Sequence, residues 1–273
     1  MTQTHTAFVG CSYTQGEGLS GTVSNENLWV NLLHNSYKPL IHTTLLNLGV
    51  SGSTNAEIFH QAINCVSNYD CRYLFVAWTS LYRYKFSLGA ETYDVQQYWS
   101  AGHPLNDVNL HPGITLTKKY LTEIKDKFFS LHHDHCEILK VLNYTATINE
   151  LCRKLGVNVY FVNNILPWDK DYFEPVVSAN RKPADTTKYT QYLLNSDTRD
   201  DQEYFEIYDK IHNEYQQTQG LRECNWLNLY SGFKENFVID FGIDKQHPGE
   251  QSHQQFAWHL LDSLQKNNKQ LQP

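Results

Sequence analysis

Short apolar runs alternate along this chain with longer segments in which apolar residues recur every three or four positions. Runs of the first kind are typical of buried strands, and segments of the second kind are typical of amphipathic helices. The pattern predicts strands at residues 7–9, 45–50, 73–78 and 157–162, a fifth at Leu227 or 237–239, and helices at 27–33, 54–66, 117–155 with a break near 132–135, and 250–264.

Strands that alternate with helices indicate βαβ units, and they predict a three-layer α/β/α sandwich around a mainly parallel sheet of about five strands. In such a sheet the ligand site lies beyond the carboxyl ends of the strands. Ser12, Gly52 and Thr79 each follow directly from a predicted strand, so we expect them at one edge of the sheet. Without a repeat or a linker, residues 1–273 are expected to form a single domain, with aromatic-rich insertions at about 80–116 and 166–225.

Composition narrows the possible partners. The chain is 41% hydrophobic and 19% charged, which is typical of a globular protein. Its formal net charge is −7 and no segment is rich in Lys and Arg, so we expect no nucleic-acid partner. No apolar run is long enough for a membrane span, and the amino terminus does not have the pattern of a signal peptide.

The cysteines indicate a reducing compartment. They are scattered and form no C-x-x-C pair, which argues against a zinc site or a disulfide framework. Reduced thiols in the cytoplasm are the expectation for them: Cys11, Cys65, Cys71, Cys136, Cys152 and Cys224.

The first candidate for chemistry is the turn after the first predicted strand, Gly10-Cys11-Ser12-Tyr13-Thr14. A nucleophile elbow of the G-x-S-x-G kind requires glycine at position 14, so Thr14 disfavours the α/β-hydrolase family. The segment instead resembles block I of the SGNH (GDSL-like) hydrolases, G-D-S-x-T, with Cys11 in place of the aspartate. The resemblance implies that Ser12 is the nucleophile.

Two further segments carry the resemblance, one of them with a departure. Asn47 to Asn55 is similar to block II, in which a glycine N–H donates into the oxyanion hole, and Gly52 is the matching position. Block III supplies an asparagine after the third strand, but this chain has Thr79 there. A hydroxyl donates one hydrogen bond, so the resemblance implies that Thr79 takes the place of the amide.

Near the carboxyl terminus, Asp244-Lys245-Gln246-His247-Pro248 resembles block V, the D-x-x-H-P signature of the same family. A catalytic histidine takes the proton of the serine and is oriented by a carboxylate on its other nitrogen. Asp244 and His247 supply both groups from one turn. The four blocks cover about residues 6–83 and 236–264, and they occur in the order that the family has.

The resemblance implies a flavodoxin-like strand order and hydrolysis of an ester, thioester or O-acetyl bond through Ser12, His247 and Asp244. The N–H groups of Ser12 and Gly52, with Thr79, would then hold the oxyanion. No cofactor or metal is needed, and the partner is a small-molecule or carbohydrate ester. Two alternatives stay open: a non-catalytic module that binds a glycan or acyl compound, and an acyltransferase that uses the same triad.

Other residues have simpler interpretations. Cys11 could act as a thiol nucleophile, but consecutive side chains point to opposite faces, so we expect a small buried hydrophobe. The histidines at 132–135 diverge by about 100° from one residue to the next on a helix, which favours a solvated break over a metal site. His253 is either a group behind the site or a surface residue. The segments at 82–99 and 168–192 are either walls of the cleft or packing insertions.

Overall fold

The structure is a computed structural model of the chain. It describes residues 4–21, 24–37, 39–40, 42–80, 83, 85–88, 91–94, 108–111, 114–116, 134–165, 224–228 and 232–270. The chain divides into two compact units, Met1–Pro167 with Cys224–Pro273 and Trp168–Glu223. All described residues belong to the first unit, and the prediction of a single domain with two insertions stays a prediction.

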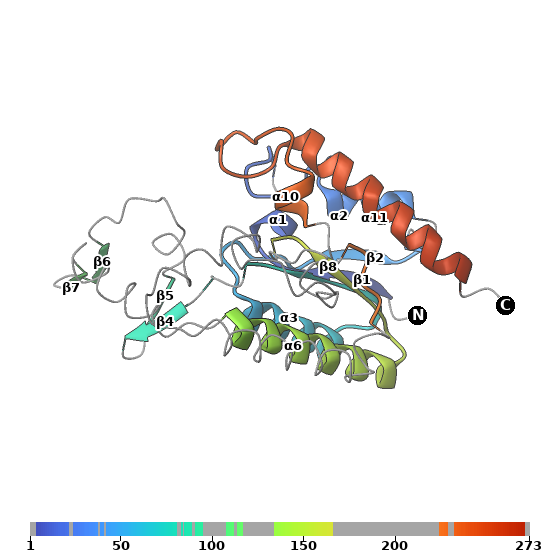
Figure 1. The fold of residues 1–273 in the computed structure, drawn as a ribbon, viewed down its shortest axis with the longest axis horizontal. Coiled ribbons are helices and arrows are strands. Elements are labelled where there is room, and N and C mark those ends of the chain that lie inside the picture. The colour runs from blue at the N-terminus through green and yellow to red at the C-terminus, as the bar shows by residue number, and fades with distance from the viewer. Residues whose placement is uncertain are drawn as a thin grey trace, which may run out of the picture. The chain divides into compact units, whose positions relative to one another are not determined.

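A parallel four-stranded sheet forms the centre of this unit, in the order β2-β1-β3-β8 (Figure 1). Its strands are β1 (His5–Val9), β2 (Thr44–Asn47), β3 (Cys71–Trp78) and β8 (Asn158–Asn163). Residues 224–228 run beside β8, because Phe161 N–H donates to Asn225 O at 2.9 Å and Leu227 N–H donates to Phe161 O at 3.0 Å. The flavodoxin-like order and the parallel sheet are therefore confirmed. Leu227 lies at the fifth position, and residues 237–239 form no strand.

Helices cover both faces of the sheet, as Figure 1 shows. Helices α3 and α6 lie on one face, and α1, α2, α10 and α11 lie on the other. Their bounds are Ser12–Gln15 for α1, Trp29–Ser36 for α2, Asn55–Asn68 for α3, Asp134–Leu155 for α6, Phe233–Asn236 for α10 and Glu250–Gln270 for α11. This arrangement confirms the predicted α/β/α class.

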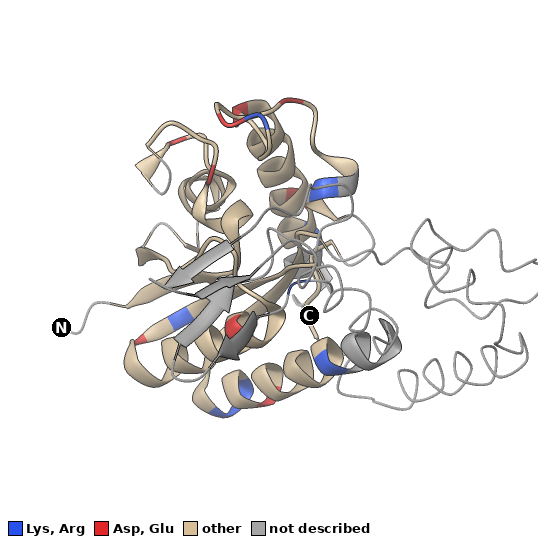
Figure 2. Cartoon of the chain, turned by 90° about the vertical axis from the view of Figure 1, so that its left-hand side faces the viewer, with Lys and Arg blue, Asp and Glu red and all other residues tan. Residues whose placement is uncertain are grey.

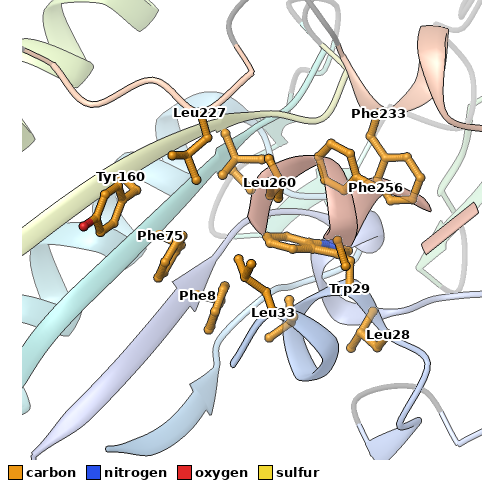
Figure 3. Close-up of a cluster of buried hydrophobic side chains, with 14 of the residues drawn as sticks. Phe8, Leu28, Trp29, Leu33, Phe75, Tyr160, Leu227, Phe233, Phe256 and Leu260 are labelled. Carbon is orange, nitrogen blue, oxygen red and sulfur yellow. The ribbon is translucent and has the colours of Figure 1, made fainter. Parts of the chain in front are cut away.

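The middle strands of the sheet read as continuous apolar runs because both of their faces are covered. On the face that α2 and α11 cover, Phe8 stacks on Phe75 with ring centroids 4.5 Å apart (Figure 3). Trp29 of α2 packs edge-on against Phe8 and against Phe256 of α11. The last helix of the chain is thus packed onto the first strand through one aromatic cluster.

Two short antiparallel hairpins lie where the sequence predicts a non-regular insertion. They pair β4 (Lys85–Leu88) with β5 (Glu91–Asp94) and β6 (Val108–His111) with β7 (Ile114–Leu116). The expected helix at 117–155 is observed from Asp134 onward, and residues 117–133 lie outside the described residues.

Charged residues are interspersed over the described elements, and Figure 2 shows Lys and Arg at separate positions. Among the described helices, none is long and apolar enough to cross a membrane.

The indole of Trp29 offers a test of the contact between α2 and α1. Its Nε1–H donates to Tyr13 O at 2.9 Å from a fully buried position. Trp29→Phe keeps most of the ring packing but removes this donor, so we expect the free energy of unfolding to fall by about 1–3 kcal/mol. Urea denaturation measures it. The exposed Trp258 is the matched control, and Trp258→Phe should stay within about 0.5 kcal/mol of the unchanged protein.

Candidate active site

Ser12 lies where β1 ends, as the first residue of the one-turn helix α1. Its side chain is buried, and its Oγ has no hydrogen-bond partner among the described residues. Cys11 precedes it as the N-cap, with extended backbone, and belongs to the hydrophobic core. The strand end therefore separates the two side chains, and Cys11 is a small buried hydrophobe as expected.

Contacts from three elements hold the turn of Ser12 in place. Asn47 at the end of β2 donates from Nδ2 to Thr14 O at 2.8 Å, and Asn164 after β8 donates to Thr14 Oγ1 at 3.1 Å. The indole of Trp29 binds the neighbouring carbonyl of Tyr13, so α1 is held by side chains from the end of β2, from α2 and from the residue after β8. The position of Ser12 is thus set by the sheet edge itself.

Asp244 and His247 lie on the loop before α11. His247 Nδ1 and Asp244 Oδ2 are 2.5 Å apart, and the other carboxylate oxygen accepts from the N–H groups of Gln246 and His247, both at 3.0 Å. The carboxylate thus binds both the ring and the backbone of the histidine. The predicted Asp–His pair is present in the geometry that fixes a tautomer with the proton on Nδ1.

The ionisation of Asp244 follows from the same contacts. Burial by itself would raise the pKa of this carboxyl. The backbone N–H groups of Gln246 and His247 and the imidazole of His247 outweigh burial and lower the pKa to about 2. Asp244 is therefore a carboxylate at neutral pH.

The loop that carries Asp244 and His247 packs directly on the segment after α1. Ile243 N–H donates to Gly18 O at 2.9 Å. Gly18 has φ +89°, and a Cβ there would lie 2.8 Å from His247 Cβ; a Cβ on Gly242 would overlap Gly18 O. Only glycine allows this close approach of the two backbones. It brings the two ends of the sequence together at one place.

His247 consequently lies beside the turn of Ser12. Its ring meets the ring of Tyr13 edge-on at a centroid distance of 6.0 Å. Its Nε2 lies 3.6 Å from Oε2 of Glu17, whose own N–H donates to Ser12 O at 3.0 Å. The structure thus places His247 against Tyr13 and Glu17, close to Ser12 in the sequence. The carboxylate of Glu17 forms the described ion-pair contact with Nε2.

The third block has a different construction from the one the family pattern implies. Thr79 is fully buried after β3, and its Oγ1 has no partner among the described residues. Its backbone is held by Asn55: Thr79 N–H donates to Asn55 Oδ1 at 2.9 Å, and Asn55 Nδ2 donates to Thr79 O at 3.1 Å. The Thr79 hydroxyl is left free to donate to a ligand, whereas the Asn55 amide is already engaged. Gly52, with φ +79°, lies in the turn just before α3.

Several residues that shape the site escaped the sequence interpretation. Asp240 accepts from the N–H groups of Gln251 and Ser252 and so caps α11. Burial would raise the pKa of Asp240, but its hydrogen bonds from Ser252 and Gln251 lower it. The sequence signal for this cap was weak because Asp240 lies ten residues before the helix starts. Asn55 and Glu17 gave no signal, since their partners are distant in sequence or belong to a loop.

No group of three or more His, Cys, Asp and Glu side chains that could hold a metal occurs within the described part of the chain. His132 and His133 lie outside it, as does the aromatic segment at 168–192. Of the segment at 82–99, only Arg83, β4 and β5 are described, so its expected role as a cleft wall or packing insertion stays open.

No family model and no curated protein sequence matches the chain. Solved structures similar to it include the acetylxylan esterase Axe2 of Geobacillus stearothermophilus, at 12% identity and TM-score 0.46, over 96% of this chain and 94% of that one. The psychrotrophic esterase EstA of a Pseudoalteromonas species has 12% identity and TM-score 0.45, with 98% and 99% covered. A lipolytic protein of the G-D-S-L family from Desulfitobacterium hafniense has 9% identity and TM-score 0.40, with 95% and 98% covered.

The Desulfitobacterium hafniense protein bears the G-D-S-L family name that the sequence motifs suggest, and the other two structures are named esterases. Their identities are 12% or lower and their TM-scores lie below 0.5. The chemistry of this chain is therefore argued from its own residues.

His253 of α11 is buried behind the site and gives a testable pH dependence. Neither of its ring nitrogens has a partner among the described residues, and its ring packs edge-on against Phe233. Burial lowers its pKa to about 3; Asp240 opposes this shift and His247 adds to it. The native protein therefore holds a neutral imidazole here, while the unfolded chain binds a proton below pH ~6.5.

Because the folded pKa of His253 is the lower one, its contribution to stability is complete above pH ~6.5 and is lost as pH falls toward 3. Between pH 7 and 4.5 we expect a loss on the order of 2–3 kcal/mol from this group. His253→Leu should flatten the dependence of unfolding free energy on pH by that amount. His60→Leu, at an exposed histidine, is the control and should leave the dependence as it is. Equal pH slopes for wild type and His253→Leu would contradict a neutral buried His253.

Proposed function

We propose that this chain is a serine hydrolase of the SGNH type that cleaves an ester, thioester or O-acetyl bond. The observation that carries the proposal is the Asp244–His247 pair, 2.5 Å apart, on a loop that packs against the turn of Ser12. A buried hydroxyl without a partner needs an explanation, and a nucleophile that waits for substrate provides one for Ser12.

In the first half of the reaction, Ser12 Oγ attacks the carbonyl carbon while Nε2 of His247 takes its proton. Asp244 holds the imidazole through Nδ1 and stabilises the imidazolium that forms. Nε2 then gives the proton to the leaving alcohol or thiol. A covalent acyl-enzyme on Ser12 remains.

Water completes the cycle: it gives a proton to His247 and attacks the acyl carbon, and Nε2 then returns the proton to Ser12 Oγ as the acid is released. Ester and water thus yield alcohol and acid, without a cofactor. Ser12 Oγ makes no hydrogen bond to Nε2 of His247 in the structure, and catalytic hydrogen bonds often tighten only in the substrate complex.

The oxyanion is assigned to the N–H groups of Ser12 and Gly52 and to the hydroxyl of Thr79. Support comes from Thr79 Oγ1, which is buried and uncommitted, while Asn55 fixes the backbone of Thr79 on both sides. Such preorganised donors stabilise charge that develops in the transition state. The site belongs to a protein that we expect in the cytoplasm.

The alternative with an observation in its favour is a binding module. Ser12 Oγ is buried, and Nε2 of His247 lies beside the carboxylate of Glu17. A module that binds an acyl compound would retain these residues and lack turnover. An acyltransferase would use the same triad with an alcohol in place of water. Labelling by a fluorophosphonate probe separates an activated serine from a binding module, and a panel of p-nitrophenyl esters, thioesters and acetylated sugars identifies the substrate class.

Ser12→Ala should abolish hydrolysis of p-nitrophenyl acetate, with a fall in kcat of at least about 10³-fold, because the covalent step is lost. Probe labelling should vanish as well, while circular dichroism stays unchanged. Cys11→Ala is the control from the adjacent position, and it should keep labelling even though it loosens the core. Activity that is lost in Cys11→Ala and kept in Ser12→Ala would show that the nucleophile is wrongly assigned.

Thr79→Val removes the hydroxyl but keeps the shape of the side chain. If that hydroxyl donates to the oxyanion, kcat should fall by about 10- to 10³-fold while KM changes little, because the donor acts mainly once charge has developed. Thr79→Ser keeps the hydroxyl and should retain most of the activity. Steady-state kinetics on the three proteins decide the point, and a Thr79→Val protein as fast as wild type would remove Thr79 from the oxyanion hole.

A further inference from the structure

Glu17 has a place in the site that the proposed chemistry does not use. Its Oε2 lies 3.6 Å from Nε2 of His247 and accepts a hydrogen bond from Ser51 Oγ. Ser51 directly precedes Gly52, the glycine assigned to the oxyanion hole. Glu17 therefore lies between the histidine and the second block of the site.

The backbone of Glu17 is held on both sides. Glu17 N–H donates to Ser12 O at 3.0 Å, and the carbonyl of the next residue, Gly18, accepts from Ile243 at 2.9 Å. The carboxylate itself is held by Ser51, which is held in turn by Gln15, whose Oε1 accepts from Ser51 N–H at 2.7 Å. These contacts keep the Glu17 carboxylate on the Nε2 side of His247.

The charge of Glu17 is not neutralised by a permanent cation in the described part of the chain. The groups in contact with its carboxylate there are the hydroxyl of Ser51 and the imidazole of His247. The carboxylate of Asp244 is committed to His247, whereas the Glu17 side chain is 42% exposed. Glu17 therefore presents a negative charge to whatever enters the site.

Nε2 is the atom that gives the proton to the leaving group, so the leaving alcohol must approach Nε2. Since Glu17 lies against that same nitrogen, the leaving alcohol and this carboxylate become neighbours. We propose that Glu17 is a specificity-determining residue that selects esters by the charge of their alcohol part, favouring cationic alcohols over neutral ones and neutral over anionic ones. The inference rests on the proposed ester hydrolysis by Ser12.

The size of the effect follows from Coulomb's law. A charge about 5 Å from the carboxylate, in a half-exposed site with an effective dielectric constant of about 40–80, changes kcat/KM by roughly 5- to 20-fold. The effect should weaken as salt is added, because the site is open to solvent on this side.

The test uses three acetate esters of similar size: acetylcholine, its uncharged isostere 3,3-dimethylbutyl acetate, and an acetate ester of a hydroxycarboxylate. Wild type should hydrolyse the cationic ester about 5- to 20-fold faster than the neutral one in kcat/KM, with the anionic ester slowest. Glu17→Gln keeps an acceptor for Ser51 and removes the charge. It should bring the three values within about 2-fold of one another.

Two variants serve as controls. Glu150→Gln removes one negative charge from an exposed position on α6 and should leave the order of the esters unchanged. Glu17→Asp keeps the charge and should preserve the preference for the cation at least in part. A purely structural role for Glu17 would instead lower all three values by the same factor.

The outcomes separate this inference from the proposed function. If wild type has equal kcat/KM for all three esters, and Ser12→Ala loses hydrolysis of the neutral ester, the role of Glu17 is overturned and the hydrolase stands. A preference that survives in Glu17→Gln overturns it as well. Failure of wild type to react with a fluorophosphonate probe and with all three esters overturns the proposed function and this inference with it.

Discussion

The site depends on the close contact between the backbone at Gly18 and the loop at Gly242–Ile243. There the carbonyl of Gly18 accepts from Ile243, and neither glycine has room for a side chain. This contact joins a segment near the amino terminus, which carries Ser12, to one near the carboxyl terminus, which carries His247. Without it, the proposed nucleophile and its proposed base would lie on separate ends of the chain.

The aromatic core between the sheet and helices α2 and α11 stabilises the elements that make that contact. Phe8, Trp29 and Phe256 bring β1, α2 and α11 together, and Trp29 also binds the backbone of α1 through its indole. The same packing buries His253 as a neutral imidazole, so the core loses stability in acid. Stability and the geometry of the site are thus linked through α11, whose first residues are capped by Asp240.

The electrostatics around His247 are set by two carboxylates with different surroundings. Asp244 receives two backbone N–H groups and the Nδ1 side of the ring, which commits it to orientation. Glu17 faces Nε2 and solvent, on the side where a leaving group must arrive. One imidazole between two acidic groups can therefore combine a fixed tautomer with selection of the substrate by its charge.

Resemblance to the SGNH hydrolases implied the strand order, whereas patterns in the sequence itself determined the α/β class and the identity of Ser12, Asp244 and His247 as candidates. Those features depend on local patterns: apolar runs that end at a polar turn, and a carboxylate three residues from an imidazole, within reach in one loop. The hairpins at β4–β5 and β6–β7 were not foreseen, because their strands are only three or four residues long and so short an alternation of apolar and polar residues is a weak signal.

Tertiary structure alone decided the partners that are far apart in sequence. Asn55 binds Thr79 across 24 positions, and Glu17 meets His247 from the other end of the chain. Neither contact leaves a local pattern, because each joins side chains that become neighbours only after the parallel sheet has aligned its strand ends. The catalytic residue types could be read from short motifs, whereas the charge next to His247 required the fold.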